Sequence, residues 1–177
     1  MTSRDKLWID FRDDSAFRES LINGNPDPIG GIRISTGDEY LVGGKNEYLP
    51  TWVTDFVIRL VDSGIDVLDG EQRTIVNHNG PSYLVIKPSD EEEVEVSHRL
   101  IWEAVEDPDE YPELIETTIT TSDTFVSAVD QVGQRLLAYI LEHNPQLTDS
   151  ETVSDLQKVL ELLEGRKQSA NIEETEE

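Results

Sequence analysis

The chain has 177 residues, no cysteine and a formal net charge of −24. A chain of this length fits one domain, and the absence of cysteine excludes disulfide bonds, thiolate catalysis and Cys-ligated zinc. Leu, Ile, Val and Phe together exceed the roughly 20% share below which so charged a chain is expected to stay disordered, so we expect it to fold.

The charge balance is the strongest compositional feature. The chain has 38 acidic and 14 basic residues. Its net charge lies far outside the magnitude of about 2–8 that is usual for a small soluble domain. Nucleic acids and anionic membranes are recognised through clusters of Lys and Arg, so we expect neither of them as a partner.

The chain is rich in Asp and Glu and poor in Lys. This composition resembles that of cytosolic proteins from salt-loving archaea, so we expect a halophile-type protein. An acidic protein without salt adaptation and an acidic mimic of nucleic acid are the alternatives. The first six residues lack the apolar stretch of a signal peptide, and no apolar run approaches the roughly 18 residues that a membrane helix needs. We therefore expect a cytoplasmic protein.

The N-terminal part of the chain predicts a strand, a short helix and a hairpin. Apolar and polar residues alternate across residues 6–12, which is the pattern of a half-buried strand. Residues 13–22 fit a short helix, which the following Asn, Gly and Pro residues end. Trp8 falls on the polar side of the strand, and we expect either residues 13–22 or a partner to cover it. Residues 31–35 and 39–42 flank a Thr-Gly-Asp turn and predict the hairpin.

A central helix is predicted at about residues 50–63. Pro50 suits its first turn, and Gly64 suits the position just after its last turn. Its apolar residues recur at the spacing of a helix that packs one face on a core. They are Val53, Phe56, Val57, Leu60 and Val61.

Short runs rich in β-forming residues follow Gly64 and predict an antiparallel meander. The segments are, in chain order, residues 65–68, 73–78, 82–87, 94–104 and 114–121.

Residues 94–104 show the clearest alternation in the chain. His98 and Trp102 fall on the apolar face of this segment, whereas Ser97 and Arg99 fall on its polar face. We expect a long strand with one face in water and with Trp102 packed inward.

Two helices are predicted to close the fold, at about residues 123–143 and 149–164. Ser122 fits the N-cap of the first helix, and residues 148–151 fit a capping box for the second. Gly165 suits the end of the second helix. The short linkage between the two helices makes them an antiparallel pair.

The expected fold class is α+β. We predict a mostly antiparallel sheet of about seven to eight short strands, packed against the central helix and the C-terminal helix pair. Residues 1–165 are expected to form a single domain, and residues 166–177 an acidic flexible tail.

The sequence carries no motif for catalysis, cofactor binding or metal binding, and we expect none of the three. Residues 43–46 lack the spacing and the Ser or Thr of a phosphate loop. The three histidines, His78, His98 and His143, have no second ligand or nucleophile at a motif spacing. His98 is expected to be a core or sheet-edge histidine. A zinc site from His78, His98 and a carboxylate is the alternative.

The segment from Asp90 to Glu116 holds twelve acidic residues and one arginine, a net charge of −11 out of −24. A solvated face that carries hydration and cations is one interpretation, and a surface that docks a basic protein is the other. An exposed aromatic side chain would anchor such an interface. The predicted partner surface consists of Glu93, Glu95, Glu103, Asp109, Glu110 and Tyr111.

The first functional hypothesis is a non-catalytic protein-interaction domain with a basic partner. Small immunity and antitoxin proteins are similar in general character, being acidic, cysteine-poor and mixed α/β, so an inhibitor of a basic toxin protein is a more specific alternative. An enzyme or small-molecule binder whose site forms only in three dimensions around His98 is another. The last hypothesis is a homodimer that forms through the C-terminal helices. Core packing also explains the apolar stripe of these helices. The stripe consists of Leu156, Val159, Leu160, Leu162 and Leu163.

Overall fold

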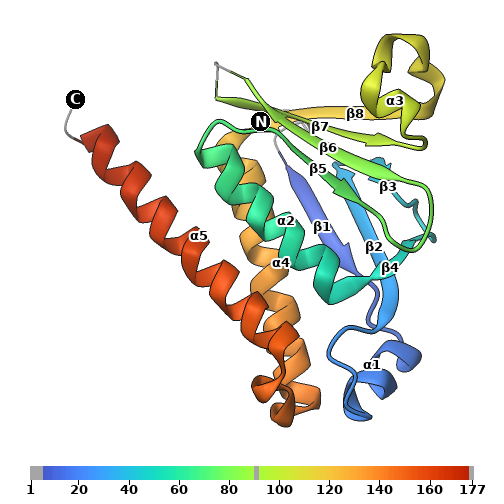
Figure 1. The fold of residues 1–177 in the computed structure, drawn as a ribbon, viewed down its shortest axis with the longest axis vertical. Helices are drawn as coiled ribbons and strands as arrows, with labels where there is room; N and C mark the ends of the chain where they lie inside the picture. Colours follow the sequence, from blue (N-terminus) through green and yellow to red (C-terminus); the bar gives the residue numbers. More distant parts are fainter. Residues whose placement is uncertain (1–5, 90–91, 176–177) are drawn as a thin grey trace.

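The computed structural model describes residues 6–89 and 92–175. These residues form eight antiparallel strands in two four-stranded sheets, together with five α-helices (Figure 1). The fold class is therefore α+β, and this prediction from the sequence is confirmed. One cluster of buried apolar side chains connects both sheets with the long helices.

The first sheet is built from the N-terminal part of the chain. β2 lies at its centre, with β1 along one side and both β3 and β4 along the other. A short helix, α1 (Ser15–Ile22), connects β1 to β2 and buries Phe17 and Leu21. The strands are β1 (Leu7–Phe11), β2 (Ile29–Thr36), β3 (Glu39–Val42) and β4 (Leu49–Trp52).

The second sheet is an antiparallel meander in the order β5-β6-β7-β8. Its inner face carries fully buried Ile86, Val94 and Val96, which belong to the common core. The strands are β5 (Arg73–Val76), β6 (Tyr83–Pro88), β7 (Glu93–Arg99) and β8 (Ile115–Thr121).

Three long helices gather on one side of the molecule and the two sheets on the other (Figure 1). α2 (Val53–Leu68) packs against both α4 (Ser122–His143) and α5 (Glu151–Thr175). The C-terminal pair forms as predicted, because the chain between the two helices is only a short 3-10 turn, Pro145–Asp149. No helix among the described residues combines the length and the apolar character that crossing a membrane requires.

The central helix begins later than the sequence pattern predicts. Pro50 lies in β4, which among the described residues is an edge strand paired with β2 alone, where a residue without an N–H is tolerated. The helix begins at Val53, because Oδ1 of Asp27 accepts hydrogen bonds from the backbone N–H groups of Thr54 (2.9 Å) and Asp55 (3.2 Å). Burial raises the pKa of Asp27, and these two hydrogen bonds act in the opposite direction.

The central helix also ends later than predicted. Gly64 lies inside α2, and the strand predicted at residues 65–68 is wrong because those residues complete the helix. A β-carbon at Gly64 would stand 2.8 Å from Cγ2 of Val129 and 3.4 Å from Cδ1 of Leu163. The glycine is therefore a contact point at which α2 approaches α4 and α5, and not a helix stop.

α5 continues through Gly165 to Thr175, beyond the predicted end at residue 164. Residues 166–175, for which the sequence predicts a tail, thus belong to this helix. Leu156 and Leu163 are fully buried in the core, whereas Leu162 is 63% exposed. The apolar stripe considered for a homodimer seam is therefore mostly used by the packing of the chain on itself.

The two glycines predicted to end helices should respond oppositely to the same substitution. Gly64→Ala is expected to lower the free energy of unfolding by about 1–3 kcal/mol, because the new methyl group meets Val129. Gly165→Ala is expected to raise it by roughly 0.5–1 kcal/mol, because alanine favours a helix and no atom lies within 4 Å of the added carbon. Urea denaturation of both variants checks this, and equal shifts would contradict the packing of α2 described above.

Candidate functional site

The chain between β7 and β8 forms a compact acidic lobe, residues 100–114. It contains α3 (Glu103–Glu106) and two 3-10 turns, Pro108–Glu110 and Pro112–Leu114, and it lies at the corner of the molecule away from α5 (Figure 1). Six of its carboxylates are exposed, and none of them forms an ion pair within the described residues. They are Glu103, Glu106, Asp107, Asp109, Glu110 and Glu113.

Arg99, the last residue of β7, holds the acidic lobe against the outer face of the second sheet. Its Nη1 donates hydrogen bonds to the backbone carbonyls of Ala104 (3.0 Å) and Val105 (3.2 Å), and its Nε donates to Oγ of Ser97 (3.0 Å). Arg99 is 7% exposed and Ala104 is fully buried. The prediction that Ser97 and Arg99 face water is therefore wrong, because the lobe folds back over this face of the strand.

β7 ends at Arg99, and the predicted long strand over residues 94–104 is too long. Trp102 therefore does not pack inward as predicted. Its side chain is 44% exposed, and its ring meets that of Tyr83 edge-on, with 5.4 Å between the centroids. Leu100 is 45% exposed in the same lobe. The acidic lobe thus presents two apolar side chains among its carboxylates.

The structure brings together only part of the predicted partner surface. Glu103, Asp109 and Glu110 are exposed on the acidic lobe, and Tyr111 beside them is half-buried. Glu93 lies at the opposite end of β7, about 20 Å from the lobe at roughly 3.3 Å per residue. Glu95 is half-buried and stands opposite Lys87 in the sheet. These two carboxylates belong to a different part of the surface.

A second candidate site is a pocket of about 700 Å³ between the two sheets, here called the inter-sheet pocket. Its volume is within the range of small-molecule sites. The hairpin of β2 and β3, the loop before β4, and strands β7 and β8 supply its walls. The lining residues that carry polar side chains are Thr36, Glu39, Tyr40, Glu47, Tyr48, His98, Glu116, Thr117 and Thr118.

His98 is the half-buried histidine of the inter-sheet pocket. Burial lowers the pKa of His98, and a hydrogen bond with the backbone of Leu41 acts in the opposite direction. The ring is therefore neutral near pH 7. Its Nε2 atom is buried and has no hydrogen-bond partner among the described residues. The carbonyl of Leu41 thus accepts from Nδ1, and the lone pair of Nε2 is left unused and shielded from solvent.

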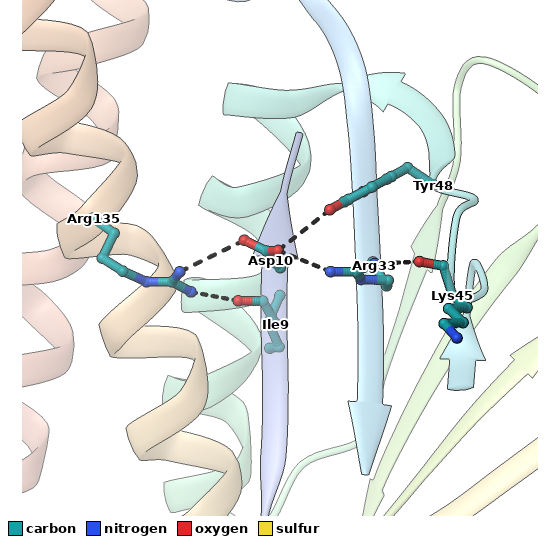
Figure 2. Close-up of polar contacts among 6 residues, drawn as sticks. All are labelled: Ile9, Asp10, Arg33, Lys45, Tyr48 and Arg135. Carbon is teal, nitrogen blue, oxygen red and sulfur yellow. Dashed lines mark hydrogen bonds and ion pairs between the residues drawn. The ribbon is translucent and has the colours of Figure 1, made fainter. Parts of the chain in front are cut away.

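Asp10 lies beside the pocket and contacts Tyr48, one of its lining residues (Figure 2). Its Oδ2 accepts hydrogen bonds from Nη2 of Arg33 (3.3 Å) and from the hydroxyl of Tyr48 (3.5 Å), and its Oδ1 lies 3.6 Å from Nη1 of Arg135. Arg33 also donates to the backbone carbonyl of Lys45 (3.2 Å). We call Asp10, Arg33, Tyr48 and Arg135 the Asp10 cluster. It ties the loop before β4 to β1, β2 and α4.

Two aromatic side chains stack on the arginines of the Asp10 cluster. The guanidinium carbon of Arg33 lies 4.5 Å from the centroid of the Tyr48 ring, and that of Arg135 lies 4.6 Å from the centroid of the Trp8 ring. Trp8 is 49% exposed, and Arg135 of α4 partly covers it in place of residues 13–22. The sequence contains no local signal for these pairings, because each joins separate elements.

The zinc site considered from the sequence does not assemble. His78 lines a smaller pocket beside Asp27 and Asp55, and His98 lines the inter-sheet pocket. Nδ1 of His143 lies 2.9 Å from the backbone carbonyl of Tyr139, in the last turn of α4. Within the described part of the chain, no group of three His, Asp or Glu side chains is placed to hold a metal ion.

Comparison with known proteins finds no match for this chain among protein-family models, curated proteins or solved structures. A functional proposal therefore rests on the geometry and charge of the acidic lobe and the inter-sheet pocket.

Proposed function

We propose that this chain is a non-catalytic protein-interaction domain whose acidic lobe docks a partner with a basic surface. One observation carries the proposal: six exposed carboxylates, unpaired within the described residues, share the lobe with Leu100 and Trp102, which are almost half exposed. Such carboxylates attract a basic surface over a distance and repel acidic competitors.

Trp102 suits the central contact of such an interface. Tryptophan is enriched among the residues that dominate binding energy, because its ring buries a large apolar area. The contact with Tyr83 restrains the ring, while 44% of Trp102 stays open to a partner. Arg99 holds the backbone of the lobe in place through its hydrogen bonds to two carbonyls. The lobe therefore loses less conformational entropy when a partner binds.

Inhibition of a basic toxin protein, in the manner of an immunity protein or antitoxin, is the more specific form of this function that we propose. Such an inhibitor needs a complementary surface and no chemistry of its own, and charge complementarity speeds its association. The composition also favours a halophile-type cytoplasmic setting, where salt screens the self-repulsion of a chain with a net charge of −24.

The test is charge reversal on the lobe. The triple variant Glu103→Lys, Asp109→Lys and Glu110→Lys should bind the partner at least tenfold more weakly, because three attractive contacts become repulsive. Immobilised wild-type chain and variant are compared in capture from a lysate of the source cells, and the retained basic protein is then purified for titration.

The matched control carries the same change in net charge on α1, α4 and α5, through Glu19→Lys, Glu142→Lys and Glu161→Lys. All three carboxylates are exposed. We expect the control to retain the partner. A partner that both variants lose equally responds to net charge alone and contradicts a docking role for the acidic lobe, as does a partner that the lobe variant retains.

A further inference from the structure

β8 is an edge strand of the second sheet, and among the described residues it pairs with β7 alone. Two hydrogen bonds beyond the ends of this pairing define its register. The N–H of Leu100 donates to the carbonyl of Leu114 (3.1 Å). The N–H of Ser122 donates to the carbonyl of Glu92 (2.8 Å). Because backbone groups alternate in direction along an antiparallel strand, the even-numbered residues of β8 direct their N–H and C=O groups toward β7.

The odd-numbered residues of β8 therefore direct their backbone groups away from the sheet. In Ile115, Thr117 and Ile119, neither the N–H nor the C=O group has a hydrogen-bond partner within the described part of the chain. Thr117 is exposed, and Ile119 is 53% exposed. This edge thus presents a row of backbone donors and acceptors that another strand can pair with.

Other edges of the two sheets are covered or short. On β5, Nη1 of Arg59 from α2 donates to the carbonyl of Val76 (2.7 Å). On β1, Nη2 of Arg135 from α4 donates to the carbonyl of Ile9. β3 and β4 have four residues each, whereas β8 has seven. Covering an edge and keeping it short are two ways in which proteins prevent strand addition, and β8 shows neither among the described residues.

The sequence of β8 also lacks the features that commonly block an edge strand. It contains no Lys, no Pro and no β-bulge. Six of its seven residues are Ile or Thr, whose branched side chains favour the extended conformation. The edge is therefore already in the conformation that strand addition requires, and in this mode of recognition main-chain hydrogen bonds supply the affinity.

Charge decides which kind of chain fits this edge. Neither Lys nor Arg occurs in residues 100–134. Glu113 and Glu116 at one end of β8 and Asp123 at the other are exposed, and none of them forms an ion pair within the described residues. A second copy would bring a further net charge of −24 and be repelled, whereas a segment with Lys or Arg is attracted.

We propose that an extended segment of a basic protein partner adds to β8 as a fifth strand of the second sheet. Its main chain pairs with the outward groups of Ile115, Thr117 and Ile119, and its Lys or Arg side chains meet the carboxylates at the ends of the strand. The acidic lobe runs directly into β8, so one partner reaches both. The inference rests on the proposed function for the existence of a basic protein partner and gives that partner a binding mode.

The test is amide hydrogen exchange of the full chain, followed by NMR, with the basic strand-forming peptide acetyl-Lys-Thr-Val-Thr-Val-Thr-Lys-amide as the probe. In the free chain the N–H of Thr118, which faces β7, should exchange slowly, and those of Thr117 and Ile119 fast. Millimolar peptide should slow exchange at Thr117 and Ile119 at least threefold and leave Thr118 unchanged. Exchange at Thr117 and Ile119 that stays fast would overturn the proposal.

Two control peptides separate strand addition from attraction by charge. The same peptide N-methylated at every Thr and Val keeps its charge but loses its N–H donors, and the peptide with Glu in place of Lys keeps the donors but reverses the charge. We expect neither to slow exchange at Thr117 and Ile119, and equal slowing by either one contradicts the proposal. Slowing that develops without peptide as the chain concentration rises would make a second copy the occupant, which also contradicts it.

A proline variant locates the binding on the chain. Ile119→Pro removes an outward N–H and no hydrogen bond to β7, whereas the control Ile119→Val keeps that N–H. We expect Ile119→Pro to bind the basic peptide at least fivefold more weakly than Ile119→Val does. Thermal melting verifies that both fold, and Thr117→Pro serves the same purpose if Ile119→Pro does not. Equal affinities of the proline variant and its control would place the peptide elsewhere and overturn the proposal.

Capture of the partner separates this inference from the docking role of the acidic lobe. Ile119→Pro is compared with the triple charge-reversal variant of the lobe. If only the lobe variant loses the partner, docking on the lobe stands and strand addition is overturned. If only Ile119→Pro loses it, strand addition stands and the docking role of the lobe fails. Loss of the partner in both variants supports both.

Discussion

Replacing Phe56 with alanine should lower the free energy of unfolding by about 3–5 kcal/mol, the largest effect that we expect from a single substitution. Phe56 is 1% exposed and lies on the face of α2 that packs into the core shared by both sheets and the long helices. Its removal takes away the transfer free energy of the ring and leaves a cavity that close-packed neighbours fill only in part. Urea denaturation measures the loss.

Leu162→Ala is the control for this substitution. Leu162 is 63% exposed on α5, so the change should stay within about 0.5 kcal/mol. The same variant tests the homodimer considered from the sequence, because Leu162 is the residue of that stripe that the core leaves open. A large, concentration-dependent loss of stability in Leu162→Ala would contradict the packing described here and favour a seam between two copies.

Replacing Arg99 with methionine should loosen the acidic lobe and lower the free energy of unfolding by about 1–3 kcal/mol. The substitution keeps an unbranched apolar stem but removes the guanidinium that donates to Ala104, Val105 and Ser97. The backbone carbonyls of Ala104, which is fully buried, and of Val105 then lose their charged hydrogen-bond donor. Hydrogen exchange of residues 100–114 should accelerate, and partner binding should weaken.

Lys87→Met is the matched control, because it removes one positive charge from the same face of the second sheet at an exposed position. We expect hydrogen exchange in the acidic lobe to stay as in the wild-type chain. If Arg99→Met also left that exchange unchanged, the lobe would be held by its own turns, and Arg99 would not be its anchor.

Local patterns were sufficient to predict most of the elements. Alternation predicts β1, and the apolar spacing predicts the core face of α2, because one side of each element meets the same core. The predicted caps place the starts of α4 and α5 to within a residue or two, but the capping residues differ. Thr121, and not Ser122, caps α4 and accepts a hydrogen bond from the backbone N–H of Thr124 (3.1 Å). At the start of α5, Ser150 accepts one from the backbone N–H of Val153 (3.2 Å).

The errors arise where a distant segment decides the local structure. Asp27 sets the start of α2 from outside the helix, and no pattern around Pro50 contains that information. Gly64 is a residue type that often ends helices, but here it lies inside α2 and lets α4 approach closely. Trp102 continues the alternation of β7 in sequence, although the strand has already ended at Arg99.

The candidate sites were predictable only in part. Charge density marks the acidic segment in which the lobe lies, and the sequence predicts three of the lobe's exposed carboxylates, Glu103, Asp109 and Glu110, but not the lobe itself. The inter-sheet pocket joins His98 to Tyr40 and Glu116, which come from three different strands. The sequence suggested a site around His98 only as an alternative to a core or sheet-edge histidine, and strand order was needed to place the neighbours of His98.

The most direct test of the central proposal is zero-length carbodiimide crosslinking of the captured complex, read by mass spectrometry. This reagent joins carboxylates of one protein to lysines of the other only where they touch. We predict that the crosslinks from this chain concentrate on Glu103, Asp109 and Glu110. Crosslinks that fall instead on Glu142 and Glu161, with none on the acidic lobe, would contradict the proposal that this lobe docks the partner.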